Sequence, residues 1–146
     1  MTNVLMLCGS LRKGSTNEAA LRTAQAVAPD GLDTTLYAGM GDLPHFNPDD
    51  DREPPHPAVA GLRAAIGAAD AVLICTPEYA GALPGSFKNL LDWTIGGGEI
   101  YEKPVAWLNV ASPPRPRAAA TRTPRCARCS ATRAPRSSRP RARGSR

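Results

Sequence analysis

The sequence lacks any long apolar segment. No uninterrupted run of 18 apolar residues occurs in its 146 residues, so no segment is predicted to cross a membrane as a helix. The N-terminus has no basic stretch followed by a long apolar one, and we therefore expect no secretory signal. Because export is not expected, the four cysteines do not indicate disulfides, and a reducing cytoplasm is the expected location.

Large apolar side chains are also absent from residues 113–146, which contain no Val, Ile, Leu, Met, Phe, Tyr or Trp. This segment is rich in Arg, Pro and Ala and cannot bury enough apolar surface to offset its ordering entropy. We therefore expect a folded domain over residues 1–112 and a disordered basic tail over residues 113–146. The tail carries 11 arginines and no acid, whereas residues 1–112 carry 7 basic and 13 acidic side chains.

The Arg-rich tail leaves a nucleic-acid-binding protein as an alternative function. Eleven guanidinium groups can contact many phosphates, with a strong dependence on salt. The tail has no aromatic side chain to stack on bases, however. The net charge of +5 also comes entirely from the tail, so we do not expect nucleic acid to be the partner of the domain.

Apolar runs and amphipathic segments alternate along residues 1–112. Strands are predicted over Val4–Cys8, Thr34–Tyr37, Ala71–Cys75 and Val105–Val110, and helices over Thr16–Ala28, Ala58–Ala69 and Pro84–Thr94. A long loop rich in proline is predicted over residues 39–57. This order of elements predicts an α/β fold, a parallel sheet with helices on both faces that ends after its fourth strand.

The loop after the first strand, residues 9–17, combines glycines, hydroxyl groups and one arginine. It opens a helix, whose N-terminal N–H groups and dipole favour an anion. The side chains able to donate hydrogen bonds are those of Ser10, Arg12, Ser15, Thr16 and Asn17. The loop has neither the GxGxxG pattern nor the Walker pattern, and it suits a monophosphate. From this loop alone, an ordinary capped turn is an equally good interpretation.

A second candidate loop, Thr76–Gly85, follows the third predicted strand. In open parallel sheets, ligands bind outside the carboxyl ends of strands at the point where the strand order reverses. Pro77 and Gly81 can fix the backbone beside a flat ligand, and Tyr79 offers an aromatic face. Taken alone, this loop is better explained by a partly buried packing Tyr79 and a solvated Glu78.

The two loops together resemble those of the NADPH-dependent FMN reductase family, flavodoxin-like proteins related to quinone and azo-dye reductases. The resemblance rests on Gly9-Ser10-Leu11-Arg12, Ser15-Thr16-Asn17, Thr76-Pro77-Glu78-Tyr79, Leu83-Pro84-Gly85, Phe87-Lys88-Asn89 and Leu91-Asp92-Trp93. The spacing and the order of these motifs agree with those of the family over residues 3–112. The resemblance implies a flavodoxin-like sheet and an oxidoreductase that uses FMN and NADPH.

The resemblance also implies roles for individual residues. The FMN phosphate would contact Ser10, Arg12, Ser15, Thr16 and Asn17, and the flavin ring would lie against Pro77, Glu78, Tyr79, Ala80 and Gly81. Many family members have Asn where this chain has Ala80, so one amide contact is expected to be missing. NADPH would pass a hydride to FMN, and a flavin, quinone or similar small acceptor would take the electrons. No protein residue is expected to act as a nucleophile, because the cofactor carries the chemistry. The helix Pro84–Trp93 is expected to form a homodimer or homotetramer.

The resemblance ends at Ser112. The family continues with a Gly-rich loop on the flavin side, a helix, a fifth strand and a final helix, and residues 113–146 match none of these. A shifted reading frame in a GC-rich gene explains the Arg/Pro/Ala-rich composition better than an evolved basic tail. An impaired or non-functional reductase is therefore a further alternative.

The remaining cysteines and histidines carry weaker signals. Cys126 and Cys129 have a CxxC spacing but no second ligand pair nearby, so no metal is expected. Cys8 and Cys75 lie in apolar strands and are predicted to be small core residues. The two histidines, His45 and His56, lie in the long loop and are predicted to be solvated rather than catalytic.

Overall fold

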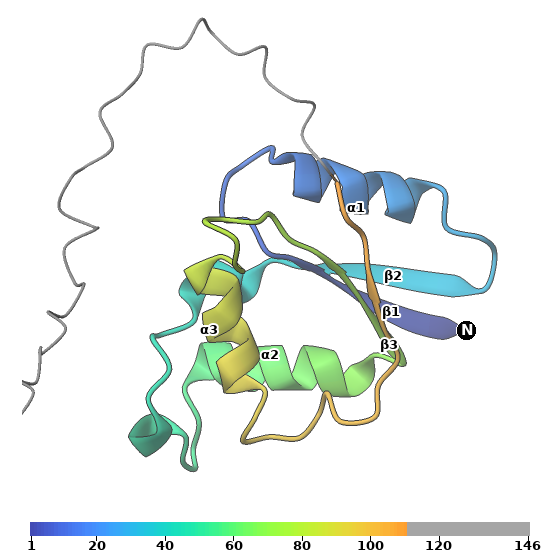
Figure 1. Cartoon of the computed structure of the whole chain (residues 1–146). Coiled ribbons are helices and arrows are strands. Elements are labelled where there is room, and N and C mark those ends of the chain that lie inside the picture. The colour runs from blue at the N-terminus through green and yellow to red at the C-terminus, as the bar shows by residue number, and fades with distance from the viewer. Residues whose placement is uncertain (111–146) are drawn as a thin grey trace, which may run out of the picture. The chain divides into compact units, whose positions relative to one another are not determined.

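The computed structural model describes residues 1–110, which form one parallel sheet with helices on both faces (Figure 1). The strands are β1 (Thr2–Cys8), β2 (Leu32–Tyr37), β3 (Ala71–Cys75) and β4 (Val105–Trp107), in the order β2-β1-β3-β4. The helices are α1 (Thr16–Ala26), α2 (Pro57–Ala68) and α3 (Gly85–Trp93). The predicted flavodoxin-like α/β fold is confirmed. The predicted tail, residues 113–146, lies outside the described residues, as does the CxxC pair.

The fourth strand is shorter than predicted. Val105, Ala106 and Trp107 pair with Val72, Leu73 and Ile74, and the last bond runs from Leu108 N–H to Ile74 O at 2.7 Å. Strand β3 ends at Cys75. The hydrogen-bond ladder between β3 and β4 does not continue into Thr76-Pro77, because proline has no N–H to donate. The prediction of a strand as far as Val110 was therefore wrong for residues 108–110.

The helix ends follow local capping chemistry. The Ser15 hydroxyl accepts from Glu18 N–H at 3.1 Å and caps α1. His56, which was predicted only to be solvated, is exposed, and its Nδ1 accepts from Ala58 N–H at 3.2 Å to cap α2. Pro84 was predicted inside the third helix, but it is the N-cap residue and α3 starts at Gly85. No helix within residues 1–110 has the length and apolarity needed to cross a bilayer.

The two faces of the sheet carry different helices. Helix α1 lies on one face and helices α2 and α3 lie on the other (Figure 1). The larger core cluster, on the α2/α3 face, is built around the side chains Leu5, Leu7, Val59, Leu62, Ile66, Val72, Ile74, Phe87, Leu90 and Trp93. The cluster on the α1 face contains only three fully buried residues, Met6, Leu21 and Cys75. Alternation along β1 and β3 produces this division, because successive side chains point to opposite faces.

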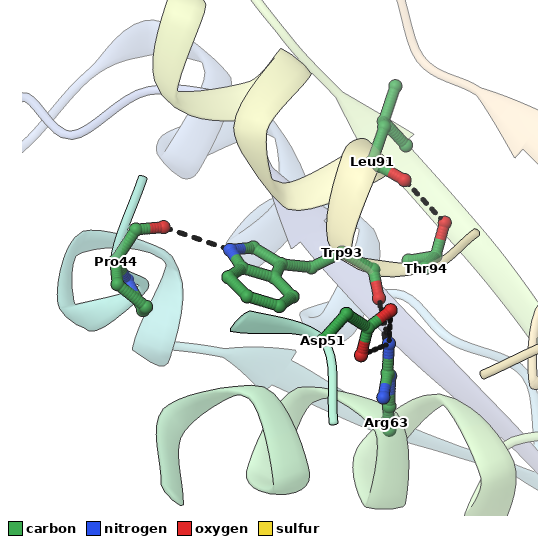
Figure 2. A network of polar contacts seen from close by, with 6 residues as sticks. All are labelled: Pro44, Asp51, Arg63, Leu91, Trp93 and Thr94. Carbon is green, nitrogen blue, oxygen red and sulfur yellow. Dashed lines mark hydrogen bonds and ion pairs between the residues drawn. The ribbon is translucent and has the colours of Figure 1, made fainter. Parts of the chain in front are cut away.

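Polar contacts hold the long loop against α2 and α3. This loop contains two short 3-10 turns, η1 (Gly39–Asp42) and η2 (Pro48–Asp50). Arg63 of α2 donates to both carboxylate oxygens of Asp51, at 2.8 and 2.9 Å, and to Trp93 O at 3.0 Å (Figure 2). Pro44 O accepts from Trp93 Nε1 and from Asn89 Nδ2, each at 2.9 Å. The loop is therefore held at two interior positions, Pro44 and Asp51, by side chains from the helices.

Candidate functional site

The candidate site lies where β1 and β3 end side by side. Cys8 and Cys75 are partners in the register of the two strands, and Gly9 N–H donates to Cys75 O at 2.8 Å. From this position the chain leaves β1 toward β2 and leaves β3 toward β4, so the strand order reverses here. Such a reversal leaves a crevice between the two loops. A cleft of about 840 Å³ occupies it.

The cleft brings the two candidate loops together. Nine of the ten predicted site residues line it, namely Ser10, Arg12, Ser15, Thr16, Asn17, Pro77, Glu78, Tyr79 and Gly81. Ala80 is not among the lining residues. Seven further residues line the cleft. Thr76, Ala82 and Leu83 belong to the second candidate loop but were given no role there, whereas Trp107, Leu108, Asn109 and Val110 were not indicated by the sequence. The ligand contacts assigned above to the predicted site residues stay predictions.

Hydrogen-bond donors gather at the end of the cleft formed by the first loop. Thr16 and Asn17 are the first residues of α1, and neither backbone N–H has an acceptor within residues 1–110. Arg12 is exposed and forms no ion pair with any carboxylate of residues 1–110. The Ser10 hydroxyl accepts from Arg12 N–H at 3.3 Å, which leaves its own proton available. This end of the cleft is a ready anion site.

Glu18 supports the first loop from the helix side. Its Oε2 accepts from Gly14 N–H at 3.3 Å, and its Oε1 forms an ion pair with Arg22 at 2.8 Å. The hydrogen bond from Arg22 and then the one from Gly14 lower the pKa of Glu18 below its ordinary value. The carboxylate is therefore engaged by its own partners and does not compete for the donors in the cleft.

The two loops touch through a glycine. A Cβ atom on Gly9 would lie 2.1 Å from Thr76 Oγ1 and 3.0 Å from the Thr76 Cα. Any side chain at Gly9 would therefore force the loops apart. The glycine that follows β1 is required by this close approach between backbones.

The second loop contains a tight turn at its tip. Tyr79 and Ala82 exchange two backbone hydrogen bonds, at 2.9 and 3.1 Å, around Ala80 and Gly81. Both central residues have positive φ, +54° at Ala80 and +79° at Gly81, the pattern of a type I′ turn. Asn-Gly is the preferred pair in this turn. Ala80 therefore holds a left-handed conformation without a side chain suited to it.

The third wall of the cleft comes from β4 and the three residues after it. Trp107 is 55% exposed and packs edge-on against Phe87, with ring centroids 6.1 Å apart. Leu108 and Val110 pack on the α1 side of the sheet. This wall was not predicted, because residues 108–110 were expected to belong to the strand. The signal was available, since residues after the carboxyl end of a strand beside the reversal point face the crevice.

Residues 1–110 contain no group of three or more His, Cys, Asp or Glu side chains placed to hold a metal ion. Both histidines are exposed, and both Cys8 and Cys75 are free thiols. The prediction that the two cysteines are small core residues is confirmed for Cys75, which is fully buried. Cys8 is only half-buried.

A parallel sheet in the order β2-β1-β3-β4, with a donor-rich cleft beyond β1 and β3, defines a flavodoxin-like α/β protein. The profile of the NADPH-dependent FMN reductase family matches residues 2–125, which extends beyond Ser112. The chain belongs to this family of oxidoreductases.

Similar proteins carry related names. The chain is 41% identical over 91 residues to a quinone reductase of Escherichia coli, an alignment that covers 62% of the chain and 48% of the relative. It is 43% identical over 111 residues to an NAD(P)H-dependent FMN reductase of Pseudomonas aeruginosa, with 75% and 60% covered. A flavoenzyme NAD(P)H:(acceptor) oxidoreductase from Paracoccus denitrificans superposes with a TM-score of 0.68 at 36% identity, with 76% and 62% covered. The chain spans about half the length of the curated relatives it matches.

Proposed function

We propose that this chain is an FMN-binding reductase that takes electrons from NADPH and passes them to a small acceptor such as a quinone. The observation that carries the proposal is the cleft itself. In a chain of the FMN reductase family, it places the free donors of the first loop opposite the turn of the second. The names of similar proteins support a quinone or a flavin as the acceptor.

The residues present fit FMN. One end of the cleft offers a guanidinium group, hydroxyl groups, an amide and the N-terminal N–H groups of α1, a donor set suited to a phosphate dianion. The remaining walls include Pro77, Leu83, Trp107 and Leu108, which suit a flat aromatic ring. Donors for the phosphate and apolar walls for the ring thus lie at different parts of one cleft.

In this proposal Ser10, Arg12, Ser15, Thr16 and Asn17 hold the phosphate, and Pro77, Glu78, Tyr79, Ala80 and Gly81 hold the ring. When bound, FMN supplies the redox chemistry by accepting a hydride and returning electrons to the second substrate. The residues of the chain bind FMN and orient it toward its substrates. The backbone N–H groups of Glu78 and Gly81, both of which line the cleft, have no acceptor within residues 1–110 and can donate to the polar edge of the ring. Ala80 does not line the cleft, and in this proposal its backbone shapes the turn.

The test of this function is turnover with matched reagents. The purified 146-residue protein is assayed over a range of FMN concentrations up to saturation, and NADPH oxidation is followed at 340 nm with and without a water-soluble benzoquinone. We expect quinone-dependent oxidation that the Arg12→Ala variant loses at low FMN and regains at high FMN. FMN binding without any NADPH oxidation would contradict the reductase and favour the non-functional alternative.

Oligomerisation through the exposed side of α3 is a second part of the proposal. Phe87, Leu90 and Trp93 face the core, while Leu83 before the helix and Ile95 after it are exposed apolar residues. These two positions supply an apolar contact at each end of the helix. Light scattering on the wild type and on a Leu83→Asp, Ile95→Asp variant tests this contact. We expect a dimer or tetramer that the variant converts to monomer, and a monomeric wild type would contradict it.

A further inference from the structure

Two thiols lie beneath the phosphate end of the cleft. Cys8 and Cys75 end strands β1 and β3, are partners in the strand register and belong to the layer between the sheet and α1. The first loop follows β1 in the chain, and the loop and the start of α1 lie beyond the carboxyl end of β1 (Figure 1). Both are predicted from the sequence to be small core residues, and that prediction gives neither of them a role in ligand binding.

The Cys75 thiol is bonded to a residue of the proposed phosphate site. Cys75 is fully buried, and its Sγ donates to Asn17 Oδ1 at 3.3 Å. This contact joins β3 to the first turn of α1, across 58 residues of sequence. Asn17 is only 7% exposed, yet it lines the cleft. The thiol therefore holds the carbonyl oxygen of the side-chain amide of Asn17, a residue that lines the cleft.

The free end of that amide is its nitrogen. Asn17 Nδ2 has no acceptor within residues 1–110, and it is absent from the buried unpartnered polar atoms of this region, where Glu99 Oε2 alone is found. The nitrogen is therefore not fully buried, and it belongs to a residue that lines the cleft. If the amide were turned over, its carbonyl oxygen would face the cleft and repel an anion, while the thiol would lose its acceptor. A protonated thiol beneath Asn17 favours the orientation that presents N–H groups.

We propose that Cys75 is a positioning residue of the phosphate site, whose thiol fixes the Asn17 amide so that Nδ2 is presented to the FMN phosphate. This inference rests on the proposed function, because it assumes FMN as the ligand. It assigns to a buried core cysteine a role in the affinity and selectivity of the site.

The protonation state of the thiol agrees with this role. Burial, and then the neighbouring Cys8, raise the pKa of Cys75 above its ordinary value. A raised thiol pKa keeps the proton on sulfur at neutral pH, and the proton is what Asn17 Oδ1 accepts. Thiolate formation would remove the donor.

Cys8 provides a matched control within the same layer. Its Sγ contacts Ser10 O at 3.7 Å and Ser15 Oγ at 3.9 Å, both longer than the Cys75 bond. The Ser15 hydroxyl is already oriented by Glu18 N–H, so it does not depend on Cys8. Removal of the Cys8 thiol tests the effect of losing a sulfur from this layer without freeing an amide.

The experiment compares FMN with riboflavin, which has no phosphate, in calorimetric titrations of the full chain. We expect Cys75→Ala to weaken FMN binding about three- to tenfold, as for the loss of one neutral hydrogen bond, and to leave riboflavin binding unchanged. Cys75→Ser keeps a donor and is expected to stay within about twofold of wild type for FMN, as is Cys8→Ala. Equal weakening of both ligands by Cys75→Ala would overturn the proposal.

A double-mutant cycle separates positioning from a general loss of packing. Once Asn17→Ala has removed the amide, the further change Cys75→Ala is expected to leave FMN affinity unaltered. Additive losses would contradict the proposal. Thermal melts of each variant establish that it is folded, and a folded Cys75→Ala that binds FMN as wild type also overturns it.

A ligand-free measurement makes the two proposals separable. The side-chain amide resonances of Asn17 in ¹H–¹⁵N spectra should shift in Cys75→Ala and remain close to wild type in Cys75→Ser. If wild type binds no FMN, the proposed function fails whatever these resonances do. If wild type binds FMN but the Asn17 resonances do not respond to Cys75→Ala, the positioning role alone fails.

Discussion

The α2/α3 face and the α1 face of the sheet differ in depth and in chemistry. Within residues 1–110, the α2/α3 face buries a large apolar cluster that includes four aromatic side chains, the buried Phe87 and Trp93 and the half-buried Tyr37 and Phe46. Among the described residues, the α1 face fully buries only Met6, Leu21 and Cys75, and it places polar residues above them at the cleft. The deep face therefore supplies most of the apolar stabilisation, while the shallow face carries the proposed phosphate site.

The polar contacts of the two faces differ in the same way. On the α2/α3 face the Arg63–Asp51 pair is largely buried and joins three segments of the chain. At the cleft, the guanidinium group of Arg12 and the backbone N–H groups of Thr16 and Asn17 have no partner within residues 1–110. Donors satisfied by protein stabilise the fold, whereas donors left free are available to a ligand.

The largest expected effect compares two leucines. Leu62 in α2 and Leu21 in α1 are both fully buried, on opposite faces. We expect Leu62→Ala to lower the free energy of unfolding by about 4–5 kcal/mol, because the deep cluster cannot close the cavity. Leu21→Ala should cost about 2–3 kcal/mol, because the shallow layer can relax. Urea unfolding measures both, and equal or reversed losses would remove the distinction between the faces.

The next effect concerns the buried ion pair. Arg63→Ala leaves Asp51, whose side chain is 15% exposed, without its partner and also frees Trp93 O. We expect a loss of about 3 kcal/mol in the free energy of unfolding. Lys88→Ala, which breaks the exposed i,i+4 pair with Asp92, is the control and should cost about 0.5 kcal/mol or less. Similar losses for the two variants would show that burial of the Arg63 pair has no consequence.

On the shallow face, Arg12→Ala should act on binding rather than on stability. Arg12 is exposed and unpaired within residues 1–110, so the melting temperature should change little. Loss of a charged hydrogen bond, about 1.5–3 kcal/mol, should weaken FMN binding by about ten- to a hundredfold. Riboflavin binding should be nearly unchanged. Equal losses of affinity for FMN and riboflavin in calorimetry would contradict the placement of the phosphate at this end of the cleft.

The smallest expected effect is a gain. Ala80 holds a φ of +54° in the type I′ turn, and asparagine adopts this conformation at lower cost. Ala80→Asn should therefore raise the free energy of unfolding by about 1 kcal/mol. Ala82→Asn, outside the left-handed positions, is the control and should give no gain. A loss of stability in Ala80→Asn would contradict the left-handed conformation of Ala80 in a type I′ turn.

Local signals predicted most of the fold. Strand β3 was predicted with its observed ends, because Ala71–Cys75 is a continuous apolar run closed by Thr76-Pro77. Most of the cleft followed from two loops placed after neighbouring strands. The contacts of Pro44 with Asn89 and Trp93, and of Asp51 with Arg63, could not be predicted, because they join segments far apart in sequence. The bond between Cys75 and Asn17 was missed for the same reason.

The most direct measurement is a calorimetric titration of the 146-residue protein with FMN, run beside riboflavin at the same ionic strength. A phosphate site at the start of α1 predicts one FMN per chain and FMN binding at least about tenfold tighter than riboflavin, as a charged hydrogen bond to the phosphate requires. This preference should weaken as salt is added, because exposed Arg12 contributes to it. Absence of FMN binding, or equal affinity for the two ligands, would contradict the assignment of the cleft.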